Sequence, residues 1–417
     1  MNQSSKRVPL VYRLVVIAAA VTLTAVGYWM TRTAPVEVKA APVLGGPLPN
    51  LTSLENTMYT QGQFPFNKAW DFVQGLGPVF TQIGCQFCHS SPVLGGNSTQ
   101  RSTFFGSVNL DGTFNPLFNE GGPLLQKMTI QMFRSNCKVK GETIPSDATI
   151  VALHQPPPLF GLGLVDNIPD NAILSNAVDK GQGIHGVANM VLDENNHVRV
   201  GRFGLKGEFA TLVQAAAEAQ GHDLTVTNPI VPDEDLPQGK PIPPNCSITT
   251  EPNDPSKQMM GMYHFLLYMA PNTPGAPNAN GKTLFKSTGC TLCHTPSYTT
   301  AKTVIVPVEW KGRTIQSNAL ANKPVQLYSD LLLHDMGPGL ADGLPMGLAT
   351  GSMFRTAPLW GLSVKISTGN GLLHDGRVTD AASAIQAHGG EASQVLANFN
   401  ALSPQDQADL IAFISSL

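Results

Sequence analysis

Two short stretches decide how this chain folds: Cys-Gln-Phe-Cys-His at Cys85–His89 and Cys-Thr-Leu-Cys-His at Cys290–His294. Both follow the pattern Cys-x-x-Cys-His, which is the attachment site of a c-type haem. Residues three and four positions apart share one side of a helical turn, so the two cysteines and the histidine can reach one macrocycle. The cysteines would bind the porphyrin as thioethers, and the histidine would bind the iron.

A disulfide or half of a zinc site is the other interpretation of such a motif. A structural zinc site needs four ligands, and neither motif has two more soft ligands at short spacing. We therefore predict two covalently attached c-type haems as the cofactors. The attachment residues are Cys85, Cys88, Cys290 and Cys293, and the iron ligands are His89 and His294.

The composition limits the class of protein. The chain has 417 residues, of which 42% are apolar, enough for two or three domains with real cores. Charged residues make up only 13%, whereas the chain holds 40 glycines and 33 prolines. This indicates a globular protein with many ordered loops. The net charge of −3, without a stripe of Lys and Arg, excludes nucleic acid as a partner.

The N-terminus has the features of a targeting segment. Lys6, Arg7 and Arg13 precede an uncharged apolar run from Leu14 to Met30. The run is long for a signal-peptide core and at the lower limit for a membrane-spanning helix. Cleavage near residues 38–40 is one outcome, and an uncleaved membrane anchor is the other. Both export the rest of the chain, so we expect a periplasmic protein, anchored to the inner membrane or released after cleavage.

Cys137 and Cys246 lie outside the two motifs. In an oxidising compartment a structural disulfide is the expected state of such a pair. A thiol-exchange role is the alternative, although the pair lacks the Cys-x-x-Cys spacing of exchange enzymes.

The expected fold is mainly α, with two cytochrome c-like helical lobes connected by long Pro/Gly loops. Residues 1–40 form the targeting segment and tether, 41–270 the N-terminal haem lobe and 271–417 the C-terminal cytochrome c domain. A Pro-, Gly- and Asn-rich stretch at 271–281 marks the boundary between the lobes. Helices are expected over 210–220, 256–269, 282–294 and from an N-cap at Ser403, which Pro404 follows.

The second axial ligand of each haem determines the chemistry, because a haem with both positions filled transfers electrons while an open one binds small molecules. For the C-terminal haem, Met336 in a Gly/Pro loop is the first candidate. For the N-terminal haem, His154 before three prolines is the candidate for a removable ligand. Arg202 would suit the haem propionates, with solvated charge as the alternative. The rivals of Met336 are Met346, Met353, His334, His374 and His388.

These stretches together resemble the di-haem oxidoreductase family, which includes proteins described as thiol oxidoreductases or peroxidases. The family is related to bacterial di-haem cytochrome c peroxidases and the MauG type. The resemblance runs in family order from about residue 80 to the C-terminus. It is carried by residues 85–96, 157–164, 201–206, 227–229, 288–296, 327–337, 354–361 and 373–377.

The resemblance implies that peroxide binds at the N-terminal haem and that the second electron arrives through the C-terminal one. An acidic side chain assists by moving a proton between the two peroxide oxygens. Related peroxidases show Asn-Pro-x-Glu where this chain has Asn-Pro-Ile-Val at 228–231. Glu234 and Glu208 are therefore the candidate catalytic acids.

We expect an exported di-haem c-type cytochrome that acts as a peroxidase-like oxidoreductase. Its partners would be a redox protein, a small oxidant such as peroxide, and the membrane through the N-terminal segment. The alternative is a non-enzymatic electron carrier in which both haems are six-coordinate. A thiol–disulfide role for Cys137 and Cys246 is a third reading.

Overall fold

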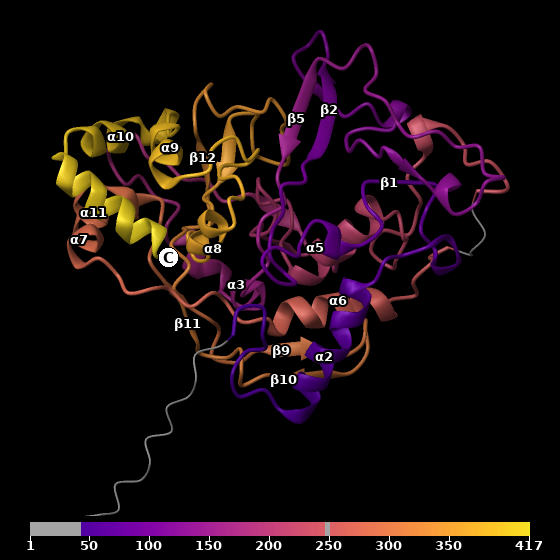
Figure 1. Ribbon diagram of the computed structural model, residues 1–417, viewed down its shortest axis with the longest axis horizontal. Coiled ribbons are helices and arrows are strands. Elements are labelled where there is room, and N and C mark those ends of the chain that lie inside the picture. Colours follow the sequence, from indigo (N-terminus) through magenta and orange to yellow (C-terminus); the bar gives the residue numbers. More distant parts are fainter. Residues whose placement is uncertain (1–42, 247–250) are drawn as a thin grey trace, which may run out of the picture. The chain divides into compact units, whose positions relative to one another are not determined.

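The computed structural model describes residues 43–246 and 251–417. Two helices from distant parts of the sequence pack together: α2 (Ser53–Asn67) and α6 (Lys257–Tyr268) (Figure 1). A capping box begins α2, because Thr52 and Glu55 each accept a hydrogen bond from the other's backbone N–H. A Cβ at Gly62 would lie 2.2 Å from the Gly261 carbonyl oxygen, so only glycine permits this close contact.

Short helices surround this pair. They are α3 (Leu162–Asp166), α4 (Asp170–Leu174) and α5 (Leu212–Glu218), which continues as a π-helical turn over Ala219–Asp223. The Thr211 side chain caps α5 by accepting a hydrogen bond from the Gln214 N–H. The position of α5 confirms the helix expected over 210–220.

All strand pairs in the described ranges are antiparallel and short. One sheet has three strands in the order β3 (Phe114–Asn115), β2 (Ser102–Val108) and β5 (Ile150–His154). The other sheets have two strands each. They are β1 (Val79–Phe80) with β4 (Met128–Thr129), β6 (Met190–Leu192) with β7 (Val198–Val200), β8 (Tyr298–Thr299) with β11 (Pro324–Val325), β9 (Ile305–Pro307) with β10 (Thr314–Gln316), and β12 (Leu333–Asp335) with β13 (Met353–Arg355).

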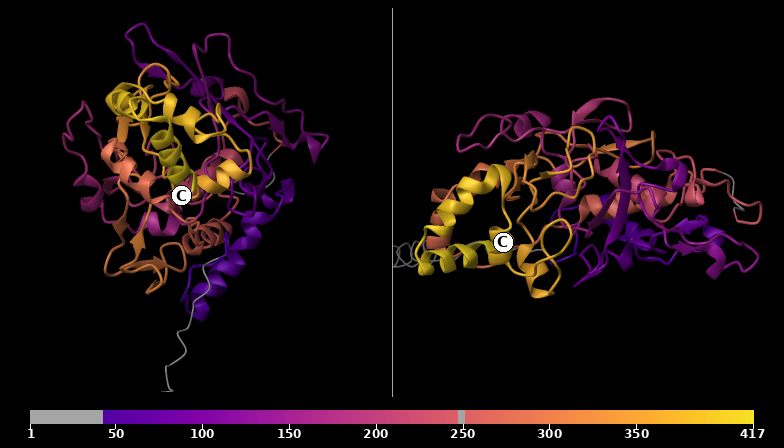
Figure 2. Two further views of the ribbon diagram at one scale, coloured as in Figure 1. Left: turned by 60° about the vertical axis from the view of Figure 1, so that its left-hand side comes forward. Right: turned by 90° about the horizontal axis from the view of Figure 1, so that it is seen from above.

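The C-terminal helices gather at one end of the described structure (Figure 1 and Figure 2). The Ser403 side chain caps the last helix by accepting a hydrogen bond from the Asp406 N–H, and Pro404 follows it, both as expected. A core of Phe285, Phe399, Leu410 and Phe413 holds the group together. The helices are α7 (Ala279–Ser287), α8 (Leu362–Ser367), α9 (Ala381–Gln386), α10 (Ser393–Asn400) and α11 (Pro404–Ser415).

The prediction of a mainly α fold was wrong. The structure is 30% helix and 14% strand. Glycine and proline break the chain into short helices, and two-stranded ladders satisfy backbone groups in the connections between them. The helix expected over 282–294 was also too long, because α7 ends at Ser287. Gly289 then turns the chain at φ 107°, a left-handed conformation that favours glycine.

Cys137 and Cys246 form the expected disulfide. Both cysteines are fully buried in a second apolar core with Trp70, Phe80 and Ile130. Buried sulfurs are not accessible to an attacking thiolate, so the disulfide has a structural role.

The predicted targeting segment lies outside the described residues. Within 43–246 and 251–417, no helix is long and apolar enough to cross a membrane. The lobe boundary at 270–271 stays a prediction.

Candidate haem site

The two Cys-x-x-Cys-His motifs fold in the same way. Each is a 3-10 turn, over Cys85–Phe87 and Cys290–Leu292. In each motif the histidine N–H donates to the carbonyl of the first cysteine at 2.9 Å. The turn thus brings the two cysteines and the histidine of each motif together, as their spacing predicts.

The motif histidines are oriented by backbone carbonyls. His89 Nδ1 lies 3.2 Å from the Gly96 oxygen, and His294 Nδ1 lies 2.9 Å from the Tyr328 oxygen. Burial lowers the pKa of both rings to about 4, so both are neutral at physiological pH. A neutral ring that donates from Nδ1 leaves Nε2 free to bind a metal. Both histidines are therefore prepared as axial ligands.

Both motifs open onto one cavity with a volume of about 540 Å³. Its lining is largely apolar, as the faces of a porphyrin require. No Asp or Glu among the described residues lines it, whereas Arg202, Arg355 and Lys365 do. An apolar cavity with cations and no carboxylate suits a macrocycle that carries anionic propionates, so the residues present fit haem. Apolar lining residues include Phe66, Leu212, Leu266, Phe285, Trp360 and Leu410.

Cys85, Cys88 and Cys290 do not resemble reactive or zinc-binding thiols. Burial, with a smaller contribution from the Asp223 charge, raises the thiol pKa of Cys85 and Cys88 to about 12. Burial raises the thiol pKa of Cys290 to a similar value of about 12. Redox-active thiols and zinc ligands need the opposite, a stabilised thiolate. In the part of the chain that the structure describes, no group of three or more His, Cys, Asp and Glu could hold a metal ion.

Near the first motif the cavity wall is an apolar side of α5, formed by Leu212, Ala215 and Ala216. Of the described lining residues before residue 270, only His89 and Met262 have a His or Met side chain. The Met262 sulfur lies 3.6 Å from the Cys85 sulfur of the first motif. The first half of the chain therefore offers the first motif few ligand groups.

The second motif faces a different set of side chains. His388 lines the cavity just beyond α9, and its Nδ1 lies 2.8 Å from the Ala384 oxygen. This contact leaves Nε2 of a neutral ring free for iron, and burial lowers the pKa of the ring. Met336 also lines the cavity. His374 lines it too, but lies against the first half of the chain: its carbonyl oxygen accepts a hydrogen bond from the Gln155 N–H at 2.7 Å, and its ring stacks on Phe354 at 4.4 Å.

Two other candidate histidines have carboxylate partners. His334 lies between Asp330, 3.1 Å from its Nε2, and Glu391, 2.8 Å from its Nδ1, so both ring nitrogens are used. His154 Nε2 lies 2.9 Å from Asp342 and does not line the cavity. The structure does not bring His154 to the first motif, and its role as a ligand stays a prediction.

Arg202 lines the cavity, but its guanidinium points to other partners. It donates to the carbonyl oxygens of Asp166 and Ile168 and forms an ion pair with Asp170. Burial lowers its pKa, and Asp170 acts in the opposite direction. This geometry makes Arg202 a support for the segment around α4.

Neither predicted acid lines the cavity. Glu208 lies close behind the wall, because a Cβ at lining residue Gly204 would be 1.9 Å from its Oε2. Its carboxylate accepts a hydrogen bond from the Lys206 N–H, and burial raises its pKa. Burial, then the charges of Glu251 and Asp235, raise the pKa of Glu234 to about 8, but no described contact joins it to the cavity.

Sequence reasoning missed Asp223, the last residue of the π-helical turn after α5. Its charge acts on the thiols of both Cys85 and Cys88, although it does not line the cavity and no described hydrogen bond joins it to either cysteine. Its Oδ1 accepts a hydrogen bond from Thr81 Oγ1 at 2.8 Å, and burial raises its pKa. Only its position just after the apolar helical face of 209–216 pointed to it, because the π-helical turn that places it cannot be read from the sequence.

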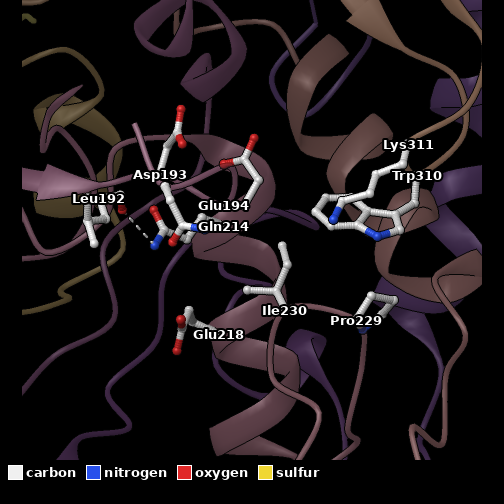
Figure 3. Close-up of a pocket in the computed structure, with 10 residues that line it drawn as sticks. Leu192, Asp193, Glu194, Gln214, Glu218, Pro229, Ile230, Trp310 and Lys311 are labelled. Carbon is white, nitrogen blue, oxygen red and sulfur yellow. Dashed lines mark hydrogen bonds between the residues drawn. The ribbon is translucent and has the colours of Figure 1, made fainter. Parts of the chain in front are cut away.

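A second, smaller pocket of about 300 Å³ lies away from both motifs and has the opposite character (Figure 3). Its lining combines Asp193, Glu194 and Glu218 with Trp310 and contains no cysteine or histidine. Carboxylates would repel haem propionates, so this pocket does not fit the cofactor.

Comparisons with known proteins agree with the geometry. No curated protein sequence matches this chain. Among solved structures, Kuenenia stuttgartiensis hydrazine synthase pressurised with xenon has a TM-score of 0.34 and 11% identity, over 92% of this chain and 98% of that chain. A TM-score and an identity this low do not indicate a shared fold or function. A family model described as "Di-haem oxidoreductase, putative peroxidase" matches residues 114–245 and 269–417, more than half of the sequence. The expected resemblance is confirmed, and the chain belongs to the di-haem oxidoreductase family, whose cofactor is haem iron.

Proposed function

We propose that this protein is an exported c-type cytochrome with two covalently bound haems and peroxidase-like activity. Cys85 and Cys88 would hold the first haem and Cys290 and Cys293 the second, with His89 and His294 as axial ligands. One observation carries the proposal: both motifs, with neutral and oriented histidines, open onto the same apolar cavity without carboxylates. Bound haem iron supplies one-electron transfer and, where an axial position is open, binding of a small oxidant.

The two haems would have different tasks. His388, or Met336 as its rival, would complete the coordination of the second haem and make it an electron relay. The apolar side of α5 offers no such ligand to the first haem, which favours peroxide binding there.

Asp223 is the favoured acid, because its charge acts on both cysteines of the first motif. Reduction of peroxide to water takes up two protons, so a carboxyl group beside the first haem is useful. Burial raises the pKa of Asp223 and so extends the pH range in which it holds a proton. Thr81 fixes one carboxyl oxygen and leaves the other to exchange a proton. Glu208, directly behind the wall at Gly204, is the second choice, and Glu234 ranks behind both.

Met262 supports the alternative function. Its thioether lies against Cys85, and methionine is a common sixth ligand of haem c. If Met262 binds the first iron, both haems are six-coordinate and the protein is an electron carrier without peroxidase chemistry.

Electron paramagnetic resonance of the purified protein, fully oxidised and half-reduced, separates the two functions. The peroxidase proposal expects a high-spin signal from one haem in at least one state and an optical change after peroxide is added. It fails if both haems stay low-spin in every state and peroxide has no effect. Met262→Leu is the matched variant. If the protein is a peroxidase, this substitution leaves the spin states unchanged. If the protein is an electron carrier with Met262 as a ligand, the substitution produces a new high-spin haem.

The proposed export of the protein and its proposed partners are inferred from the sequence alone. The charged N-terminus and the apolar run from Leu14 to Met30 support a periplasmic location, with the run kept as an inner-membrane anchor or removed. Electrons would come from a redox partner protein. Protease accessibility of the protein in intact spheroplasts tests the location, because a cytoplasmic chain would be protected.

A further inference from the structure

Arg355, in β13, lines the cavity with a guanidinium that has no carboxylate partner. Its Nε donates to the Gly204 oxygen at 2.9 Å and one terminal nitrogen donates to the Thr356 oxygen at 3.4 Å. Within residues 43–246 and 251–417, no ion pair involves Arg355, although the Glu208 charge acts on it. One side of the guanidinium fork is therefore available to a ligand.

Lys365, in α8, also lines the cavity. Its ammonium group makes no hydrogen bond or ion pair with any part of the chain that the structure describes. The end of α8 meets the first half of the chain, because Asn370 donates to the Lys365 carbonyl and, through Nδ2, to Asn97 Oδ1 at 3.0 Å. Arg355 lies at a similar junction, where its N–H donates to the Leu205 oxygen at 2.9 Å.

Two unpaired cations in an apolar cavity are costly unless an anion accompanies them. Removal from water lowers the pKa of Arg355 to about 10 and that of Lys365 to about 8. Both groups therefore remain largely protonated at pH 7. Glu208 acts on Arg355 from behind the wall, but no described Asp or Glu lines the cavity, so any negative charge inside the cavity has to come from the bound molecule.

Arg202 provides the contrast. It lines the same cavity, yet Asp170 and backbone carbonyls already satisfy its guanidinium. The sequence pointed to Arg202 as the partner of the haem propionates, whereas the contacts leave Arg355 and Lys365 as the cations available to bind them.

We propose that Arg355 and Lys365 bind the propionate carboxylates of the cofactors and serve as their counter-ions. The inference rests on the proposed haem attachment and deepens it. A guanidinium offers a carboxylate two parallel hydrogen bonds, and an ammonium offers a compact charge. Their positive charges also disfavour the oxidised, more positive iron, so both residues raise the reduction potential of the haem they serve.

Potentiometric titration of the full-length, haem-loaded protein tests this without peroxide. Lys365→Met is the main variant, because it breaks no hydrogen bond of the described side chain. Arg355→Gln is the second. Each should move the redox equilibrium of at least one haem tenfold or more towards the oxidised state, a fall of about 59 mV for one electron. Lys365→Arg and Arg355→Lys should recover most of the shift.

The control is Lys302→Met, which removes an exposed cation away from the cavity lining and should leave both potentials unchanged. Wild-type potentials in both Lys365→Met and Arg355→Gln would overturn the inference. A second result would also overturn it. If added sodium propionate changes the spectrum or the potentials of the wild type but not those of the variants, Arg355 and Lys365 bind a free carboxylate instead of the haem propionates. If the variants shift the haem potentials but the wild-type protein does not react with peroxide, only the proposed peroxidase activity is contradicted.

Discussion

The two Cys-x-x-Cys-His motifs have the same local structure and different surroundings. Each is a 3-10 turn, and each histidine is neutral and bound through Nδ1 to a backbone carbonyl. Around Cys290–His294, His388 after α9 and Met336 after β12 line the cavity, whereas around Cys85–His89 the wall is α5 with Met262 at its edge. The two motifs are therefore alike locally, and residues far away in the sequence make their surroundings different.

Removing one attachment site at a time should have the largest effect. Cys85→Ser with Cys88→Ser should remove the first haem, halve the haem absorbance to about one group per chain, and abolish the peroxide response. Cys290→Ser with Cys293→Ser should cost the same absorbance but leave a first haem that still binds peroxide in the oxidised state. Pyridine haemochrome spectra and stopped-flow mixing measure both quantities. A peroxide response confined to the second haem would reverse the assignment of tasks.

Asp223→Asn should slow the reaction with peroxide by about 10²–10⁴-fold, because the amide cannot transfer a proton while its size and position are kept. Single-turnover stopped-flow rates measure this directly, and the spectrum of the second haem should not change. Glu234→Gln is the matched control, since the charge of Glu234, unlike that of Asp223, is not among those that act on Cys85 and Cys88. Equal losses in both variants would rule out a specific role for Asp223.

The sequence predicted haem as the cofactor, which the family confirms, because the motif is contained in five consecutive residues. Which residues hold the haem stays a prediction. It also predicted the ends of α6 and α11 closely, since Pro271 and the Ser403–Pro404 cap act locally. The roles of Arg202 and His334 depend on Asp170 and Glu391, which only the fold brings close.

The same limit explains the error in fold class. Apolar residues at helical spacing and the capped C-terminal helix indicated a mainly α fold, but strand pairs such as β2 with β5 join segments about fifty residues apart in sequence. Such long-range pairing depends on tertiary contacts that local patterns do not contain. Asp223 was missed for a similar reason, because it lies in the π-helical turn after α5, from which its charge acts on Cys85 and Cys88.

His388→Ala should sharpen the comparison by making the second site resemble the first. Without the imidazole, the second haem should change from low-spin to high-spin and bind small ligands such as imidazole or cyanide. Electron paramagnetic resonance and absorption spectra measure the change. Met336→Leu is the control, and a high-spin second haem in that variant, with no effect of His388→Ala, would transfer the role of sixth ligand to Met336.

The smallest expected effect concerns two histidines outside the iron sites. Near the second motif, His334 is 3% exposed between Asp330 and Glu391. Burial acts to lower its pKa, but the hydrogen bonds to Asp330 and to the Cys293 sulfur, together with the charges of both groups, raise the pKa to about 11. On the side of the first motif, His222 is 42% exposed between Glu218 and Asp235, whose hydrogen bonds raise its pKa to about 10. His334→Gln should lower the free energy of unfolding by about 2 kcal/mol at pH 7, and His222→Gln by less than about 1 kcal/mol because solvent screens the exposed pair.

The raised pKa of His334 determines how the stability difference between wild type and His334→Gln changes with pH. An unfolded histidine titrates near pH 6.5. Because the folded pKa of His334 is higher, its ion pairs stabilise the protein fully below about pH 6.5, and their contribution falls as pH rises towards 11. The difference between wild type and His334→Gln should therefore narrow between pH 7 and pH 9 in urea unfolding. A difference that stays constant over this range would show that His334 stabilises the protein by packing and not by its charge, and the second motif would lose its distinctive buried ion pair.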